Sequence, residues 1–229
     1  MNYVVPLWNP PAVPVTNTEA AFPVRHIYCV GRNYAEHARE MGADPEREPP
    51  FFFSKPADAI ALNGATIAYP LATSNLHHEI ELVVAIGKKG VQISAEAALH
   101  HVFGYAVGLD MTRRDLQAAA KEKGRPWDTG KGFDESAPIT PIHPVSEVGH
   151  IDKGAIWLKV NGEMRQQGDI SQMIWSVPEI IVFLSTLYTL RPGDLIFTGT
   201  PAGVGRVNPG DHMTGGVDAL ADISIRVAK

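Results

Sequence analysis

The amino-acid sequence predicts a mostly β domain of the α+β class. Short apolar segments of strand-like composition outnumber helical patterns along the 229 residues, and the helical patterns are few and scattered. Strands and helices do not alternate in the regular order that a doubly wound α/β sheet requires. The glycine-rich segment 199–205 lacks the spacing of a dinucleotide-binding fingerprint, and no clear helix follows it.

The first half of the chain begins with a proline-rich arm. Residues 1–24 contain five prolines, and we expect an extended arm with one short strand there. A helix is predicted over 33–42, because Asn33 can cap its start and Gly42 can end it. A short helix is predicted over 94–100. Strands are predicted over 25–31, 51–56, 78–87 and 101–111.

The second half holds a hairpin and the two longest helical patterns. Apolar residues alternate over 155–167, and Asn161-Gly162 is the two-residue turn that β-hairpins favour. Helices are predicted over 112–124 and, starting near Pro178, over 177–190. A turn and strand follow over 191–199, and one or two strands over 211–227. No linker divides residues 25–229, so we expect them to form one domain.

Composition and charge exclude several classes of function. The net charge of −5 comes without a basic cluster, which argues against nucleic-acid binding. No apolar run approaches the roughly 18 residues of a membrane helix, so no membrane partner is expected. The N-terminus does not resemble a secretory signal, and one cysteine cannot form an internal disulfide. We therefore expect a cytoplasmic protein.

Three carboxylates form a candidate metal site. Glu79 and Glu81 are two residues apart in an apolar run, so on a strand they point to the same face. Asp110 ends another apolar run, where aspartate is unusual. Three converging carboxylates would give an all-oxygen site, which Mg²⁺, Mn²⁺ or Ca²⁺ prefers. The alternative is an exposed edge strand with Asp110 in a turn. His77 and His78 suggest zinc only weakly, since no helical ligand spacing follows.

A second constellation is His37 with Glu40. Residues three apart share a helix face, and a glutamate bonded to histidine can orient it and raise its basicity. The pair could then activate a water molecule. The alternative is an exposed contact on a solvated helix.

Single polar residues near strand ends are weaker candidates. Lys55 and Lys131 could neutralise an anionic substrate or a developing enolate, although a single lysine is more often a surface residue. Thr198 and Thr200 could offer hydroxyl and amide groups to a carboxylate, or form a plain turn.

Seven segments together resemble the fumarylacetoacetate hydrolase family, and within it the short acylpyruvate-cleaving enzymes. They keep the family's order and spacing over roughly residues 25–227. These segments are "CVGRNYAEHAREMG", "FFFSKP", "NLHHEIELVVAIGK", "GYAVGLDMTRRDLQ", "GKGFDESAPI", "WLKVNGEMRQQG" and "LIFTGTPAGVG".

The resemblance implies a mixed β-sandwich roll with short peripheral helices, a homodimer, and a role for each candidate residue. It implies Mg²⁺ or Mn²⁺ as cofactor, with Ca²⁺ as a possible substitute, held by Glu79, Glu81 and Asp110. It places a water-activating dyad on a short helix that can act as a lid, at His37 and Glu40. It places substrate contacts at Arg32, Lys55, Arg114, Gln117, Lys131 and Thr200, with Lys131 also stabilising an enolate.

The expected activity is hydrolysis of a carbon–carbon bond in a 2,4-diketo acid. We expect fumarylpyruvate as substrate, because residues 22–60 are most similar to bacterial enzymes of aromatic-acid breakdown. Alternatives at the same site are acylpyruvase or oxaloacetate decarboxylase activity, and isomerisation or decarboxylation of a related unsaturated diacid. Alternatives of another class are an inactive metal-binding module and a ligand carrier without metal.

Overall fold

The fold is organised around one strand that is buried on both faces. The computed structural model describes residues 2–40 and 48–229. In it all seven residues of β8 (Ile80–Ile86) are buried. Leu82 and Val84 contact one hydrophobic core, whereas Val83 and Ala85 contact a second core on the opposite face. A strand covered on both faces favours apolar residues, which explains the unbroken run "LVVAI" after Glu81.

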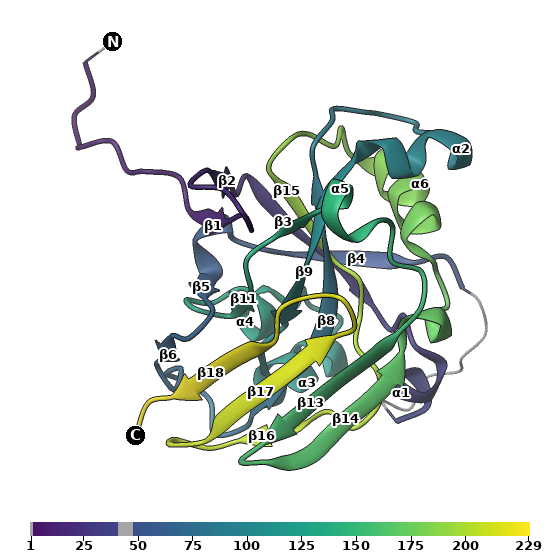
Figure 1. Ribbon diagram of the computed structural model, residues 1–229. Helices are drawn as coiled ribbons and strands as arrows, with labels where there is room; N and C mark the ends of the chain where they lie inside the picture. Colours follow the sequence, from purple (N-terminus) through teal and green to yellow (C-terminus); the bar gives the residue numbers. More distant parts are fainter. Residues whose placement is uncertain (1, 41–47) are drawn as a thin grey trace.

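This strand lies in the middle of an eight-stranded mixed sheet (Figure 1). The other strands are β3 (His26–Gly31), β4 (Phe51–Lys55), β5 (Ile60–Leu62), β9 (Val102–Leu109), β11 (Ala137–Ile139), β12 (His143–Pro144) and β15 (Asp194–Phe197). Their order is β4–β3–β15–β8–β9–β11–β5, and β12 also pairs with β9. β15 runs parallel to β3 but antiparallel to β8, so the sheet is mixed.

A five-stranded sheet covers one face of the larger sheet. Its strands are β6 (Thr66–Ile67), β13 (Ala155–Val160), β14 (Glu163–Asp169), β17 (His212–Val217) and β18 (Ile223–Val227). Their order is β14–β13–β17–β18–β6, and Figure 1 shows them lying across β8 and β9. Ile156 and Met213 of this sheet share a core with Ile80 and Leu82 of the larger one. The sheets thus form the mixed β roll that the family resemblance implies.

A three-stranded sheet closes the lower end of the roll. It consists of β10 (Thr112–Arg113), β7 (Leu76–His78) and β16 (Gly205–Val207), in that order. Only Glu79 separates β7 from β8, although the two strands belong to different sheets. The single strand predicted over 78–87 is therefore wrong in this respect, because the chain changes sheet at Glu79.

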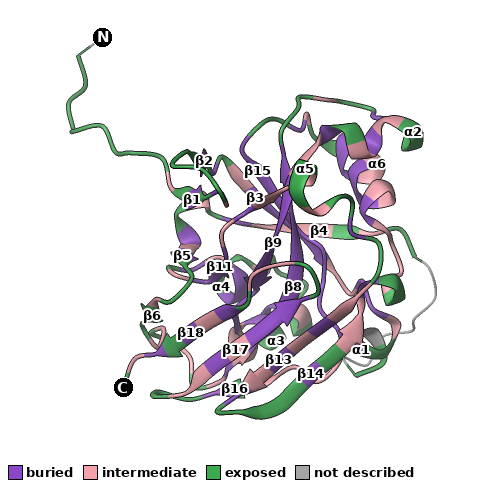
Figure 2. Cartoon of the chain, viewed as in Figure 1, coloured by how far each residue is buried: buried purple, intermediate pink, exposed green. Residues whose placement is uncertain are grey.

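The predicted N-terminal arm has two parts. Residues 2–11 carry no helix or strand and are almost entirely exposed (Figure 2). After them, β1 (Ala12–Pro14) and β2 (Ala21–Pro23) form an antiparallel hairpin, one strand more than expected. Val13 and Phe22 of this hairpin are buried in the second core. The boundary at residue 24 remains a prediction.

Short helices surround the sheets. They are α1 (Ala35–Glu40), α2 (Ala95–Ala98), α3 (Arg114–Glu122), α4 (Asp128–Lys131), α5 (Val145–Val148) and α6 (Val177–Leu187), with 3₁₀ turns at Ala57–Ala59, Leu99–His101 and Ile170–Gln172. A capping box of Ser176 and Glu179, with Pro178 in the first turn, starts α6 where the sequence predicts it. No helix in the described part of the chain has the length and apolar character that crossing a membrane requires.

The start of α1 corrects one expectation. Asn33 does not cap this helix, because its amide group bonds elsewhere. Asn33 Nδ2 donates to the carbonyls of Trp175 and Thr198, at 2.9 and 2.8 Å, and its Oδ1 accepts from the Trp175 amide at 2.7 Å. Asn33 thereby ties the start of α1 to two distant segments. The predicted helix end at Gly42 lies outside the described residues.

Candidate active site

The register of β8 and β9 brings the three predicted acids together. Ile80 lies opposite Leu109 in this antiparallel pair, and the Asp110 amide donates a 2.8 Å hydrogen bond to the Glu79 carbonyl. Glu79 and Asp110 therefore lie opposite each other where the pairing ends. Glu81 is one pleat repeat from Glu79, so its side chain emerges on the same face.

These carboxylates could hold a divalent metal. One oxygen from each of Glu79, Glu81 and Asp110 lies within 4.8 Å of the other two, and all three residues are buried. Asp110 Oδ1 is buried without a hydrogen bond, because Lys55 Nζ lies 2.8 Å away but outside a hydrogen-bonding direction. Buried carboxylate oxygens normally have partners, so this oxygen suits a metal bond. An all-carboxylate donor set fits Mg²⁺ or Mn²⁺ better than zinc.

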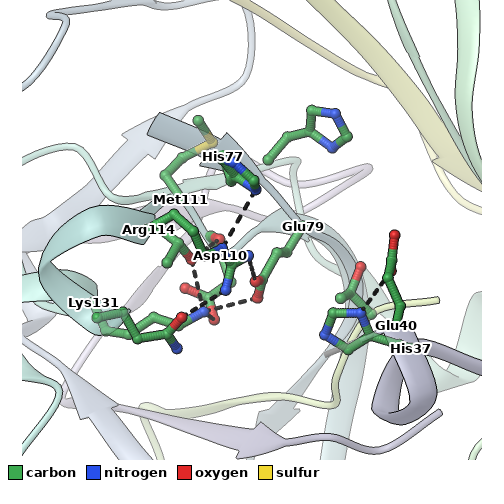
Figure 3. A network of polar contacts seen from close by, with 12 residues as sticks. His37, Glu40, His77, Glu79, Asp110, Met111, Arg114 and Lys131 are labelled. Atoms are coloured by element: carbon green, nitrogen blue, oxygen red, sulfur yellow. Dashed lines mark hydrogen bonds and ion pairs between the residues drawn. The ribbon is translucent and has the colours of Figure 1, made fainter. Parts of the chain in front are cut away.

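Three cationic side chains contact the acids, and Figure 3 labels two of them, Lys131 and Arg114. Lys131 Nζ donates to Glu79 Oε2 at 2.8 Å, Asp110 Oδ2 at 2.6 Å and Thr112 Oγ1 at 2.7 Å, which uses all three of its protons. Arg114 Nη2 pairs with Glu79 Oε1, and Lys55 pairs with Asp110. Three cations thus face three acids, and their formal charges cancel. Lys55 and Lys131 are buried ion-pair partners rather than surface lysines.

The cations act unequally on the acids. Burial alone would raise the pKa of Glu79, but Lys131 and then Arg114 outweigh burial and hold that pKa well below its usual value. The pKa of Glu81 is instead raised well above its usual value, by burial and then by Asp110 and Glu79. Glu81 accepts one hydrogen bond, from the Gly199 amide at 2.8 Å, and pairs with no cation among the described residues. Its charge would gain most from a bound metal ion.

The predicted dyad lies on α1, beside the acids. His37 Nδ1 is 3.2 Å from Glu40 Oε2, and the Gly203 amide donates to both Glu40 oxygens, at 3.1 and 3.3 Å. His37 is buried, whereas Glu40 is exposed. Figure 3 shows the imidazole between the carboxylates of Glu40 and Glu79, with its second nitrogen directed away from Glu40. This arrangement would allow Glu40 to orient His37 as a base.

Gln166 connects the loop after β15 to the strand that carries the acids. Its Nε2 donates to Thr200 Oγ1 at 2.7 Å and to the Pro201 carbonyl at 2.8 Å. Its Oε1 accepts from the Ile80 amide at 3.1 Å and lies 2.9 Å from His78 Nδ1. Because Thr200 Oγ1 accepts this bond, its own hydroxyl proton remains available to a ligand in the pocket.

One pocket contains most of the predicted residues. It is lined by Arg32, His37, Glu79, Glu81, Asp110, Arg114, Gln117, Lys131 and Thr200. Arg114 and Gln117 project together from α3, and Arg114 Nη1 donates to Gln117 Oε1 at 2.6 Å. Two predicted residues do not line the pocket. Glu40 lies behind His37, and Lys55 lies behind Asp110. The structure thus brings the predicted residues together, while their roles remain predictions.

Sequence reasoning missed several residues that shape the site. Of residues 163–167 in β14 ("EMRQQ"), Gln166 is the one that is buried. Nothing in the sequence distinguishes it from Gln167. Gly199 and Gly203 offer backbone amides, which side-chain patterns do not reveal. The positive φ of both glycines, 98° and 94°, fits the glycine-rich loop.

Comparisons with known proteins agree with this geometry. Residues 26–228 match the family described as fumarylacetoacetate hydrolase, C-terminal. Fumarylpyruvate hydrolase of Ralstonia sp. is 50% identical over 184 residues, 80% of this chain and 95% of that protein. The mitochondrial oxaloacetate tautomerase of Homo sapiens is 45% identical over 205 residues, 90% of this chain and 92% of that protein.

A solved structure extends the likeness to the whole chain. It is that of fumarylpyruvate hydrolase from Pseudomonas aeruginosa in complex with Mn²⁺ and pyruvate. It is 57% identical, covers 99% of both chains and superposes with a TM-score of 0.97. By sequence and by structure, the chain belongs to the fumarylacetoacetate hydrolase family.

Proposed function

We propose that this protein is a divalent-metal-dependent hydrolase that cleaves fumarylpyruvate, a 2,4-diketo acid, into fumarate and pyruvate. The observation that carries the proposal is the buried cluster of Glu79, Glu81 and Asp110, which shares one pocket with His37. The Ralstonia and Pseudomonas relatives support the substrate. An intact His37–Glu40 contact favours an enzyme over an inactive metal-binding module.

The three acids would hold the metal. A bound Mg²⁺ or Mn²⁺ supplies Lewis-acid polarisation of the substrate's 2-oxo acid end. With a divalent ion, the formal charge of the acids and the three surrounding cations would become positive by two. That charge suits the carboxylate and developing enolate of the pyruvyl part. The Mn²⁺ in the Pseudomonas relative agrees with a hard divalent ion.

The dyad would supply the nucleophile. Glu40 orients His37, and His37 Nε2 takes a proton from a water molecule. The water oxygen forms a bond to C4 of the substrate, and the C3–C4 bond then breaks. The electron pair of that bond goes to C3, which gives the enolate of pyruvate. The proton held by His37 returns to C3, and the new carboxyl group at C4 releases the second proton of the water to solvent. Fumarate and pyruvate then leave with atoms and charges balanced.

The remaining residues would position the substrate. Gln117 and the Thr200 hydroxyl can hydrogen-bond the pyruvyl carboxylate, next to Arg114. Lys131 has its three protons engaged, so it stabilises the enolate by its charge and by holding Glu79 and Asp110 in place. Lys55 acts at one remove, through Asp110.

A substrate panel tests the proposal. The protein loaded with Mn²⁺ or Mg²⁺ is assayed with fumarylpyruvate, acetylpyruvate and oxaloacetate in parallel, together with His37→Asn. Rapid release of pyruvate from fumarylpyruvate supports the substrate, and its absence rejects it. Loss of about 10²–10⁴-fold in kcat for the variant supports the dyad. A variant with the wild-type kcat rejects it.

Oxaloacetate is the second candidate substrate, because the human relative is an oxaloacetate tautomerase. Decarboxylation of oxaloacetate would use the same metal-stabilised enolate and needs no attacking water. We therefore expect any decarboxylation to resist the His37→Asn change far better than hydrolysis does. Equal loss of both reactions would show that His37 serves more than water activation.

The resemblance implies three further properties that we include in the proposal. The enzyme would be a homodimer in the cytoplasm and would act in the breakdown of aromatic acids. Light scattering coupled to gel filtration measures the oligomeric state, and a monomer at working concentration would reject the dimer. Growth of a deletion strain on aromatic acids tests the pathway.

A further inference from the structure

One face of α3 lines the pocket over its full length. Arg114, Gln117 and Lys121 follow each other at spacings of three and four residues, so they lie in one row on the helix. Arg114 contacts Glu79 at the acid cluster. Lys121 lies seven residues further on, roughly 10 Å along the helix axis. The row therefore runs from the acids toward the opposite end of the pocket.

Lys121, at the far end of this row, and Arg32, which follows β3, are two pocket cations without an acid partner among the described residues. Lys121 and Arg32 both line the pocket and are partly buried. Within residues 2–40 and 48–229, neither forms an ion pair with a carboxylate. Burial, and then repulsion from Arg32 and Arg114, lowers the pKa of Lys121. An anion bound between these like charges would relieve their repulsion.

The backbone at Arg32 shows that this cation is held in place. Arg32 has a φ of 57°, which is uncommon for a residue other than glycine and costs free energy. It follows Gly31, the last residue of β3, and its guanidinium lies 5.7 Å from the centre of the Phe51 ring. The turn thus directs a charged side chain toward the pocket.

Aromatic rings form part of the pocket wall. Phe53 and Trp127 line the pocket, with ring centres 5.7 Å apart, and Trp127 also contacts Phe51 edge-on at 5.2 Å. A flat, conjugated acyl chain packs well against such rings. Fumarylpyruvate is a seven-carbon chain whose first and last carbons are carboxylates, so a substrate with its pyruvyl end at the acid cluster would place the second carboxylate further along this pocket.

We propose that Lys121 and Arg32 form a subsite for the distal carboxylate of the substrate, which makes the enzyme selective for dicarboxylic diketo acids. The inference rests on the proposed function, since it assigns one end of that substrate. A neutral acyl group such as acetyl would leave both cations partly desolvated and unpaired. That loss of free energy should lower kcat/KM for such a substrate. The pyruvyl end remains at the acid cluster.

The test compares two substrates on matched variants. Lys121→Met and Arg32→Gln are assayed with fumarylpyruvate and acetylpyruvate at saturating Mn²⁺. For each variant, we expect the ratio of kcat/KM for fumarylpyruvate to that for acetylpyruvate to fall about 10- to 100-fold, mainly through KM. Lys123→Met is the control. Lys123 lies two residues after Lys121, just past the end of α3, is exposed and lines no part of this pocket. Its ratio should equal that of the wild type.

Each outcome is decisive. A ratio unchanged in both pocket variants overturns the subsite while fumarylpyruvate hydrolysis by the wild type leaves the proposed function standing. A wild type that does not hydrolyse fumarylpyruvate overturns both. Circular dichroism identifies the folded variants. If Lys121→Met is unfolded, the ratio of kcat/KM values for the two substrates is compared between Arg32→Gln and the wild type. The monomethyl ester of fumarylpyruvate at its distal carboxylate gives a second measure, since its kcat/KM should be insensitive to both substitutions relative to the free acid.

Discussion

The imidazole nitrogen Nδ1 of His37 lies 3.2 Å from Glu40 Oε2, and this contact joins a buried side chain to an exposed one. The contact leaves His37 Nε2 directed toward the acid cluster, where a water molecule would have to be activated. Glu40 is itself held from the other side by the Gly203 amide. The orientation of a buried imidazole therefore depends on a surface carboxylate and on a loop more than 160 residues away in sequence.

Removing the charge of Glu40 should lower kcat without affecting the metal. Glu40→Gln keeps the size of the side chain but no longer stabilises a protonated His37, so we expect kcat to fall about 10- to 100-fold, part of the typical contribution of a general base. Steady-state kinetics and metal analysis measure the two quantities. Glu36→Gln is the control, since Glu36 lies on the same helix and pairs with exposed Arg39. Equal kcat in both variants would contradict the dyad.

Glu81→Gln should separate metal binding from stability. Glutamine can still accept the Gly199 hydrogen bond, but it removes a buried charge that has no cation partner in the described part of the chain. We expect the metal-free variant to unfold at the wild-type temperature or above. Its affinity for Mn²⁺ should fall more than about 100-fold. Loss of a residue that only hydrogen-bonds to a metal ligand typically costs about 10- to 100-fold, and loss of a ligand itself should cost more.

Calorimetric titration with Mn²⁺ and thermal unfolding in EDTA provide both measurements. Glu163→Gln, an exposed change, should alter neither. Wild-type affinity in Glu81→Gln would remove Glu81 from the set of metal ligands.

The fold class was predictable from the sequence, because it depends on local patterns. The unbroken apolar run at residues 82–86 and the Asn161-Gly162 turn each indicate their element without tertiary information. The change of sheet at Glu79 was not predictable, since it depends on which distant strands pair with each half. The N-terminal hairpin was missed for the same reason, as Val13 is buried only by the second core.

The site was predictable only where it depends on local spacing, and not where it depends on contacts between distant segments. The spacing of Glu79 and Glu81 places them on one face, but only the register with β9 brings Asp110 opposite. Family resemblance located the candidates that spacing left open. Gln166 and the backbone amides of Gly199 and Gly203 were not predicted. Their contacts form between segments that lie far apart in the sequence.

Lys131→Met should destabilise the protein more without metal than with it. The change keeps much of the side-chain volume but leaves Glu79 and Asp110 with one cation fewer in a buried cluster. Removing one partner of a buried ion pair typically costs about 3–5 kcal/mol, and we expect a loss of unfolding free energy of that size in EDTA. A bound divalent ion restores positive charge, so the loss should shrink at saturating Mn²⁺.

Urea unfolding with EDTA and with Mn²⁺ gives the two values. Lys89→Met, at an exposed position, should change neither. A loss that is the same in both conditions would show that Lys131 contributes through packing rather than through the charge of the cluster.

Gly203→Ala should impair activity through the loop that holds Glu40. Gly203 has a φ of 94°, and an added Cβ would lie 2.0 Å from the Arg165 carbonyl oxygen, so the loop must move. Movement breaks the bond from the Gly203 amide to Glu40 and with it the orientation of His37. Gly162→Ala is the matched control, because Gly162 has a φ of 85° but no atom within 4 Å of the added Cβ. Both variants carry the left-handed strain of about 1–2 kcal/mol, yet only Gly203→Ala should lower kcat. A similar kcat in the two variants would mean that the Gly203 bond does not position the dyad.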